Sequence, residues 1–390
     1  MAIVINGSGT VTGLAVGGLP DGTVDDGTLA SSAVTEAKIA TDAVTTTKIP
    51  AALENTFVSG RKNLIINGAM QINQRGTTAT GGSSALHYGG CDRWRMYQEN
   101  TAIAYTLSQD SNSPDGFGSS YKIDVTTADS TLDTADRADF IYRFEGNELQ
   151  HLKKGTASAE SVTLSFWVSS PKTGTHIVEF YDLDNTRQIS KAYTVNSANT
   201  WEYKTITYAG DTTGAYGNDA NASVQISFWL MAGSNFTSGT LNTSWGSVTG
   251  ANRAVGQVNV MDSTSNNFYL TGVQLELGST ATDFEHRSYG EELALCQRYF
   301  EKLGRGGGYA GDRAYNHSSR IVNLPTWATT KRADPTVTIY SNDGTANAMS
   351  GYSSGSNLTV TSLSDPNQYS VGRFITLASA ITQPHIGYFH

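Results

Sequence analysis

Apolar side chains recur at every fifth position in the first fifty residues of the chain. These positions are Leu14, Leu19, Val24, Leu29, Val34, Ile39, Val44 and Ile49. On a helix this spacing turns successive side chains by roughly 140°, and on a strand it alternates between the two faces. Neither regular structure would gather these residues on one side, whereas the Gly, Thr, Ser and Asp residues between them permit turns.

This repeat is too poor in apolar residues to fold as a single chain. One apolar side chain in every five residues does not offset an ordering cost of about 1–2 kcal/mol per residue. Several parallel copies around one axis would bury these side chains against one another. We therefore interpret residues 1–50 as an oligomeric stalk, with a polar linker that lacks fixed structure as the alternative.

Residues 63–288 contain a series of segments in which apolar and polar residues alternate, as in strands that bury one face. The first are predicted at residues 64–66 and 69–74, and residues 92–97 place two arginines opposite Trp94 and Met96. The clearest segments are residues 161–168, 176–181, 201–208, 224–230 and 268–277. Because turn residues and no helical pattern separate them, we predict a mainly β fold, an antiparallel jelly roll or β-sandwich.

One helix is predicted after this sandwich, at residues 289–304. Ser288 and Glu291 have the spacing of a capping box, and a glycine-rich run ends the pattern. Residues 305–390 alternate again, for example at 336–340 and 373–377, and predict a small C-terminal β domain. We interpret residues 51–62 as a hinge between the stalk and the sandwich.

Composition and charge narrow the function classes. With 38% hydrophobic and 16% charged residues and 40 glycines, the chain fits a β-rich extracellular or virion protein better than a helical enzyme. A net charge of −9 without a basic cluster disfavours nucleic-acid binding. No apolar run approaches the roughly 18 residues of a membrane span, and the N-terminus lacks a signal-peptide pattern. We therefore expect no membrane insertion and no secretory route.

The residues that carry chemistry in other proteins form no recognisable active site here. Cys91 and Cys296 match neither a metal motif nor a disulfide framework, so we expect free thiols. Residues 351–355 match Gly-x-Ser-x-Gly, but the helix that a catalytic elbow requires does not follow. We interpret a group of five aspartates as a solvated acidic loop rather than as a calcium site, because they lack the spacing of a known calcium-binding loop: Asp124, Asp129, Asp133, Asp136 and Asp139. We predict no catalytic residue, no cofactor and no metal, and a protein that is not an enzyme.

Aromatic residues in polar loops are the remaining lead to a binding site. Sugar rings stack on aromatic faces, while neighbouring amides and carboxylates bind sugar hydroxyls. The candidate receptor-binding residues are Trp327, Tyr352, Tyr369, Asn357 and Asp365. The alternative is that such aromatic residues only anchor loops to the core. At the N-terminus, an apolar strand is suited to attachment by adding to the sheet edge of a partner: Ile3, Val4 and Ile5.

Several motifs resemble those of a known protein group. They are residues 63–76 (NLIINGAMQINQRG), 92–94 (DRW), 272–285 (GVQLELGSTATDFE), 289–299 (YGEELALCQRY) and 331–340 (KRADPTVTIY). In these motifs, and in the repeated Ala-Val-Thr-x-x-Lys-Ile of the stalk, the chain resembles tail-fibre-like virion proteins of tailed bacteriophages, including marine phages. The resemblance implies a homotrimer with the stalk residues on its axis, a particle-bound N-terminus and a jelly roll similar to carbohydrate-binding modules. It implies no catalytic residues.

Taken together, residues and resemblance predict a non-enzymatic phage fibre protein that assembles in the host cytoplasm and resides in the virion. Its N-terminus would join the tail, an adaptor or another virion protein. Its distal β domains would bind a receptor on the host surface, a glycan. Two alternatives stay open, namely a structural or decoration fibre of the capsid or collar without a receptor role, and a glycan-degrading tailspike.

Overall fold

The computed structural model describes residues 4–5, 11–12, 61–81, 85–303, 320–322, 324, 326–341, 345–350, 357–372 and 374–378. The chain divides into two compact units, Met1–Ser59 and Gly60–His390. In the first unit, β1 (Val4–Ile5) pairs antiparallel with β2 (Val11–Thr12), so Val4 and Ile5 of the predicted attachment segment lie on a strand. The remaining predicted residues of this unit lie outside the described residues: Ile3, Leu14, Leu19, Val24, Leu29, Val34, Ile39, Val44 and Ile49.

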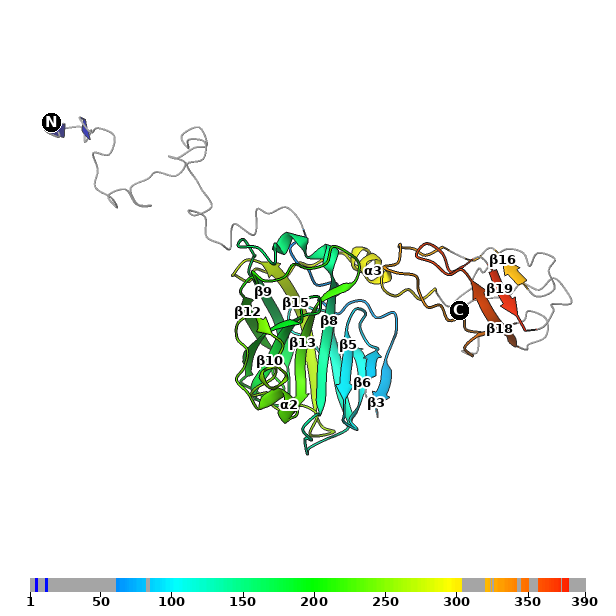
Figure 1. Ribbon diagram of the computed structural model, residues 1–390, viewed down its shortest axis with the longest axis horizontal. Helices are drawn as coiled ribbons and strands as arrows, with labels where there is room; N and C mark the ends of the chain where they lie inside the picture. The colour runs from blue at the N-terminus through cyan, green and yellow to red at the C-terminus, as the bar shows by residue number, and fades with distance from the viewer. Residues whose placement is uncertain are drawn as a thin grey trace. The chain divides into compact units, whose positions relative to one another are not determined.

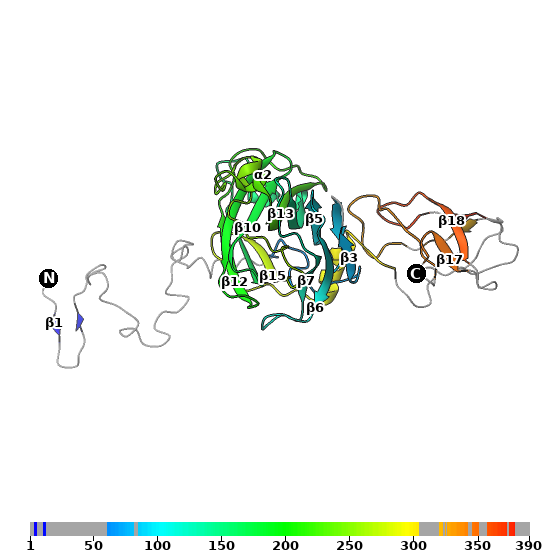
Figure 2. The ribbon, with the colours of Figure 1, turned by 90° about the horizontal axis from the view of Figure 1, so that it is seen from below.

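Two antiparallel sheets form the larger part of the second unit (Figure 1). The seven-stranded sheet has the order β14 (Gly246–Ser247), β11 (Arg187–Val195), β10 (Gly174–Asp182), β13 (Ala222–Ala232), β8 (Arg137–Glu145), β5 (Arg95–Glu99) and β4 (Ala85–Tyr88). The six-stranded sheet has the order β12 (Glu202–Tyr208), β9 (Val162–Ser169), β15 (Asn267–Leu277), β7 (Ser120–Thr127), β6 (Ala104–Asp110) and β3 (Thr78–Gly81). Figure 2 shows them as two layers, so the predicted mainly β sandwich is confirmed.

The core lies between these two layers and consists of alternate residues of each strand. On β9, the four residues predicted to share one face are all buried in it: Val162, Leu164, Phe166 and Val168. Aromatic rings fill its centre, where Trp94 stacks on Phe140 with ring centroids 5.0 Å apart. Burial of a large apolar side chain contributes roughly 1.5–3 kcal/mol. The same alternation decides which residues of each strand point away from the core.

The strands predicted at residues 64–66 and 69–74 are wrong, since residues 66–69 form a turn. Asparagine side chains take the backbone donors of this segment. Asn63 Oδ1 accepts from Ile65 N at 2.9 Å, and Asn67 Oδ1 accepts from Ile72 N at 3.0 Å. Such side chains compete with the backbone ladder of a sheet. The apolar residues of the segment still enter the core.

The helix α3 (Tyr289–Gln297) starts where predicted but ends earlier than residue 304. Ser288 caps it, since its Oγ accepts from Glu291 N at 3.4 Å. After Gln297, Arg298 donates twice to the Glu145 carboxylate, at 2.9 and 2.6 Å, which holds this segment against β8. A tertiary contact therefore replaces the last predicted turns. Among the described residues, no helix has the length and apolar character needed to cross a membrane.

A small antiparallel sheet lies in the predicted C-terminal β region. Its order is β16 (Arg320–Val322), β19 (Phe374–Leu377), β18 (Asn357–Ser364) and β17 (Ala348–Ser350). Ile339, Ile375 and Leu377 form its buried core. The strand predicted at residues 336–340 is reduced to one bridge between Tyr340 and Ala346.

Candidate binding site

The seven-stranded sheet has a second face, which points away from the core and is rich in polar side chains. Directly paired residues of neighbouring antiparallel strands lie on the same face of a sheet. One row of such pairs runs from β4 to β11: Tyr88, Arg95, Ile141, Ser227, Glu179 and Ser190. Two flanking rows are Arg143, Gln225, Tyr181 and Gln188, and Leu86, Tyr97, Asp139 and Trp229. We call these three rows the outer face.

The segment that contains α2 (Ser234–Thr237) and Arg253 covers one part of the outer face. Figure 2 shows α2 beyond β10 and β13, on the side away from the six-stranded sheet. Phe236 packs near Trp229, and Arg253 donates to both oxygens of Glu179 at 2.8 and 2.7 Å. At the β4 end, by contrast, Leu86 and Tyr88 are each 44% exposed. The open part of the outer face therefore lies at β4, whereas Asp139 and Ile141 of β8 are buried.

Several polar atoms of the outer face are buried without a hydrogen-bond partner in the described part of the chain. They include both amide atoms of Gln188, the indole nitrogen of Trp229 and Nη2 of Arg95. An unpaired buried polar group costs about 1–3 kcal/mol. Gln188 and Trp229 are fully buried, whereas Arg95 lies beside the exposed Tyr88, where a polar ligand would supply an acceptor for Nη2.

Other side chains of the outer face hold one another in place. Arg143 Nε donates to Gln225 Oε1 at 2.8 Å, and Gln225 Nε2 donates to Ser227 Oγ at 2.8 Å. Arg137 donates to both oxygens of Asp139, at 2.8 and 3.1 Å. Such networks orient their members before a ligand arrives.

A pocket of about 200 Å³ borders the open part of the outer face. Its wall contains two carboxylates, Asp92 and Glu145, and four aromatic rings, Tyr88, Phe144, Tyr299 and Phe300. Five arginines complete its polar lining: Arg75, Arg93, Arg95, Arg143 and Arg332. We call this feature the arginine pocket. Its positive groups outnumber its negative ones.

Burial makes the charged forms of this pocket costly. Burial and the neighbouring charge of Arg95 lower the pKa of Arg143 to about 10. Burial likewise lowers the pKa of Arg75 and raises the pKa of the Asp92 carboxyl. A pKa near 10 still leaves Arg143 protonated at neutral pH, so the pocket keeps its positive charge.

The structure brings together part of the predicted receptor site in the C-terminal region. Trp327 N donates to Tyr369 O at 3.2 Å, and its indole nitrogen donates to Asn367 O at 2.9 Å. Asn367 Nδ2 in turn donates to the backbone oxygen of Asp365 at 3.2 Å. Tyr369 is 69% exposed, so its ring is free to contact a ligand.

Other predicted positions lie apart. Asn357 starts β18, whereas Asp365 follows the end of that strand, and Tyr352 lies outside the described residues. The two cysteines are free and buried, as predicted. The aspartates weighed as a calcium site do not converge: no group of three metal-ligating residues occurs in the described part of the chain. Asp139, for example, belongs to the outer face and pairs with Arg137.

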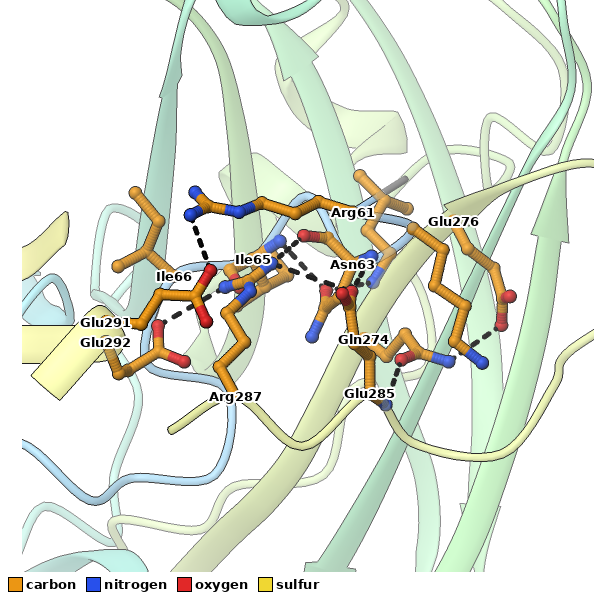
Figure 3. Close-up of polar contacts among 12 residues, drawn as sticks. Arg61, Asn63, Ile65, Ile66, Gln274, Glu276, Glu285, Arg287, Glu291 and Glu292 are labelled. Atoms are coloured by element: carbon orange, nitrogen blue, oxygen red, sulfur yellow. Dashed lines mark hydrogen bonds and ion pairs between the residues drawn. The ribbon is translucent and has the colours of Figure 1, made fainter. Parts of the chain in front are cut away.

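Three of the motifs that carry the family resemblance, residues 63–76, 272–285 and 289–299, meet in a polar cluster (Figure 3). Asn63 Oδ1 accepts from both Ile65 N and Leu275 N, at 2.9 and 3.1 Å. Its Nδ2 donates to Val273 O at 3.2 Å. These bonds fasten the segment before the sandwich to β15.

Charged residues extend this cluster to α3. Arg287 donates to the backbone oxygens of Asn63 and Ile65 and pairs with Glu292 at 3.3 Å. Arg61 pairs with Glu291 at 2.5 Å (Figure 3). The motif residues thus join three segments of the fold through hydrogen bonds and ion pairs.

Comparisons with known proteins give likeness in fold. No protein-family model matches the chain, and no curated protein matches it. The enzymatically active domain of bacteriophage CBA120 tailspike protein 4 matches with a TM-score of 0.30 and 15% identity, over 55% of this chain and 21% of that one. A family 4 carbohydrate-binding module matches with a TM-score of 0.28 and 18% identity, over 54% and 98%. A family 11 module of a Clostridium thermocellum cellulase matches with a TM-score of 0.26 and 13% identity, over 54% and 100%.

Proposed function

We propose that this protein binds a glycan on the outer face of its seven-stranded sheet. The observation that carries the proposal is the buried, unpartnered Nη2 of Arg95, which lies beside the exposed ring of Tyr88. Sugar hydroxyls accept hydrogen bonds, as Nη2 of Arg95 requires, and the CH face of a sugar ring stacks on tyrosine. Because the reported TM-scores do not exceed 0.30, the proposal rests on these side chains.

Two tyrosines provide a matched test. Tyr88 of the outer face and Tyr203 of β12 in the other sheet are each 44% exposed. A glycan array with the full chain identifies a ligand, and titration calorimetry gives its Kd. We expect Tyr88→Ala to weaken binding about tenfold or more and Tyr203→Ala to change it less than about twofold. Equal effects of the two variants, or a blank array, would contradict the proposal.

We further propose that the glycan is a host receptor and that the protein is a non-enzymatic fibre of a phage particle. The support is the five-residue repeat of the N-terminal region and the motif resemblance. In this proposal the chain is a homotrimer in the virion, attached by its N-terminus to a tail or other virion protein. Light scattering should give three times the chain mass of 41.6 kDa, and a stable monomer would contradict it.

A second glycan contact is proposed in the C-terminal loop, where the exposed ring of Tyr369 lies beside Trp327. Several weak sites on one trimer gain avidity of about 10²–10⁴. Tyr369→Ala should therefore lower adsorption of the trimer more than it lowers the affinity of one chain. Equal losses in both assays would remove this contact from the proposal.

The two rival functions differ from this proposal in measurable ways. A glycan-degrading tailspike would release oligosaccharides from the bound glycan, whereas a binding fibre leaves its length unchanged. A decoration fibre would give a blank array, and particles that lack it would adsorb normally. Reducing-end assays and adsorption counts therefore separate the three functions.

A further inference from the structure

The arginine pocket contains more charge than the binding of neutral sugars requires. In the described residues, none of its five arginines has a carboxylate oxygen within 4.0 Å of a guanidinium nitrogen: Arg75, Arg93, Arg95, Arg143 and Arg332. Of its two carboxylates, Glu145 is already paired with Arg298 at 2.6 Å. Asp92 accepts from Gln74 Nε2 at 2.5 Å. Its own acids therefore leave the pocket with uncompensated positive charge.

Neutral groups hold these arginines in position instead. Arg93 Nη2 donates to Arg143 O at 2.6 Å, and Arg95 Nη1 donates to the Tyr88 hydroxyl at 2.6 Å. Aromatic rings support the guanidinium planes, with Arg93 Cζ 3.4 Å from the Tyr299 ring centre and Arg75 Cζ 3.6 Å from that of Phe300. Stacking of this kind orients a guanidinium while it leaves N–H groups available.

Free donors remain on these oriented groups. Arg95 is only 8% exposed, yet its Nη2 has no partner in the described part of the chain. Arg93 Nε is also buried and has no hydrogen-bond partner among the described residues. A buried donor without an acceptor is destabilising, and an anion with two or more oxygens would satisfy these donors and the excess of positive over negative groups. At about 200 Å³, the pocket is far larger than the roughly 10–15 Å³ that one water needs.

We propose that the arginine pocket binds the anionic group of an acidic sugar, a carboxylate or a sulfate, while the rest of the glycan lies along the outer face. This inference rests on the proposed glycan binding and names the class of glycan. Tyr88 connects the two regions, since it belongs to the outer face and also lines the pocket. The acidic sugar would thus lie at the β4 end of the outer face.

The test uses the full chain and probes that share one sugar backbone. They are a uronic-acid oligosaccharide bound on the array, the same oligosaccharide with its carboxyls reduced to alcohols, and a sulfated form of the reduced one. We expect the acidic probes to bind about tenfold or more tightly than the reduced probe. The stronger of the carboxylated and sulfated probes identifies the source of the anion.

Arginine variants locate the effect in the pocket. Arg95→Gln and Arg143→Gln should each weaken binding of the acidic probe about tenfold more than they weaken binding of the reduced probe. Arg61→Gln, which changes an exposed arginine outside the pocket, should alter neither. A cooperative thermal unfolding transition shows that a variant is folded. If one of the two pocket variants does not fold, the other provides the test.

The outcomes separate this inference from the proposed function. If the array binds only neutral glycans, or if both pocket variants bind the acidic probe as the natural chain does, the inference is wrong while glycan binding stands. A blank array contradicts glycan binding itself, and the inference with it. Selective loss of the acidic probe in the pocket variants supports both.

Discussion

Replacing Asn63 with alanine tests the buried cluster that joins the segment before the sandwich to β15. The side chain accepts from Ile65 N and Leu275 N and donates to Val273 O. Asn63 is 3% exposed, so its truncation leaves these backbone groups unpaired in a buried site. At about 1–3 kcal/mol for each of the three unpaired groups, we expect a loss of roughly 3 kcal/mol or more in the free energy of unfolding. That is a large share of a typical stability of about 5–15 kcal/mol.

Urea unfolding of the full chain, followed by tryptophan fluorescence, measures this loss. The midpoint should fall while the slope of the transition stays the same, because the surface exposed on unfolding is unchanged. Asn147→Ala is the matched control, since Asn147 is exposed and its replacement should change stability by less than about 0.5 kcal/mol. A loss below about 1 kcal/mol in Asn63→Ala would refute the role that we assign to the cluster.

Three further predictions concern other parts of the chain. Burial lowers the pKa of His176 below its ordinary 6.5, so the unfolded chain takes up the proton first as the pH falls. The free energy of unfolding, measured with urea, should therefore decrease as the pH falls below 6.5. His176→Gln should make this decrease with pH less steep, and the same pH dependence in both proteins would contradict the prediction. A Cβ at Gly68 would lie 2.1 Å from Val273 O, so Gly68→Ala should lower the melting temperature by roughly 4 °C or more, whereas Gly118→Ala, with open space around it, should not. Removal of residues 1–20 should leave the melting of the second unit unchanged and prevent incorporation into particles, and normal incorporation would count against attachment by this segment.

Local features of the fold could be predicted from the sequence. The alternation on β9 is a local pattern, and so is the spacing of Ser288 and Glu291 that starts α3. The end of α3 could not be predicted, because Arg298 and Glu145 are 153 positions apart in the sequence. Residues 63–76 have the composition of strands, but their asparagines bind backbone groups, which only the folded segment reveals.

The candidate site was harder to predict because it depends on strand register. Arg143 and Gln225 lie 82 positions apart and become neighbours only through the pairing of β8 with β13. Seen in the sequence, each is one more polar residue on a half-buried strand. Trp327 and Tyr369 are predicted as binding residues instead, because an aromatic residue in a polar loop can be recognised without knowing how the strands pair. Their role in receptor binding stays a prediction.

The most direct test of glycan binding on the outer face is a structure of the full chain with an array-selected glycan bound. The account predicts electron density for sugar at the β4 end of the outer face, within hydrogen-bond distance of Arg95 Nη2 and in contact with the Tyr88 ring. Sugar bound only at the loop of Trp327 and Tyr369, or on the six-stranded sheet around Tyr203, would contradict it.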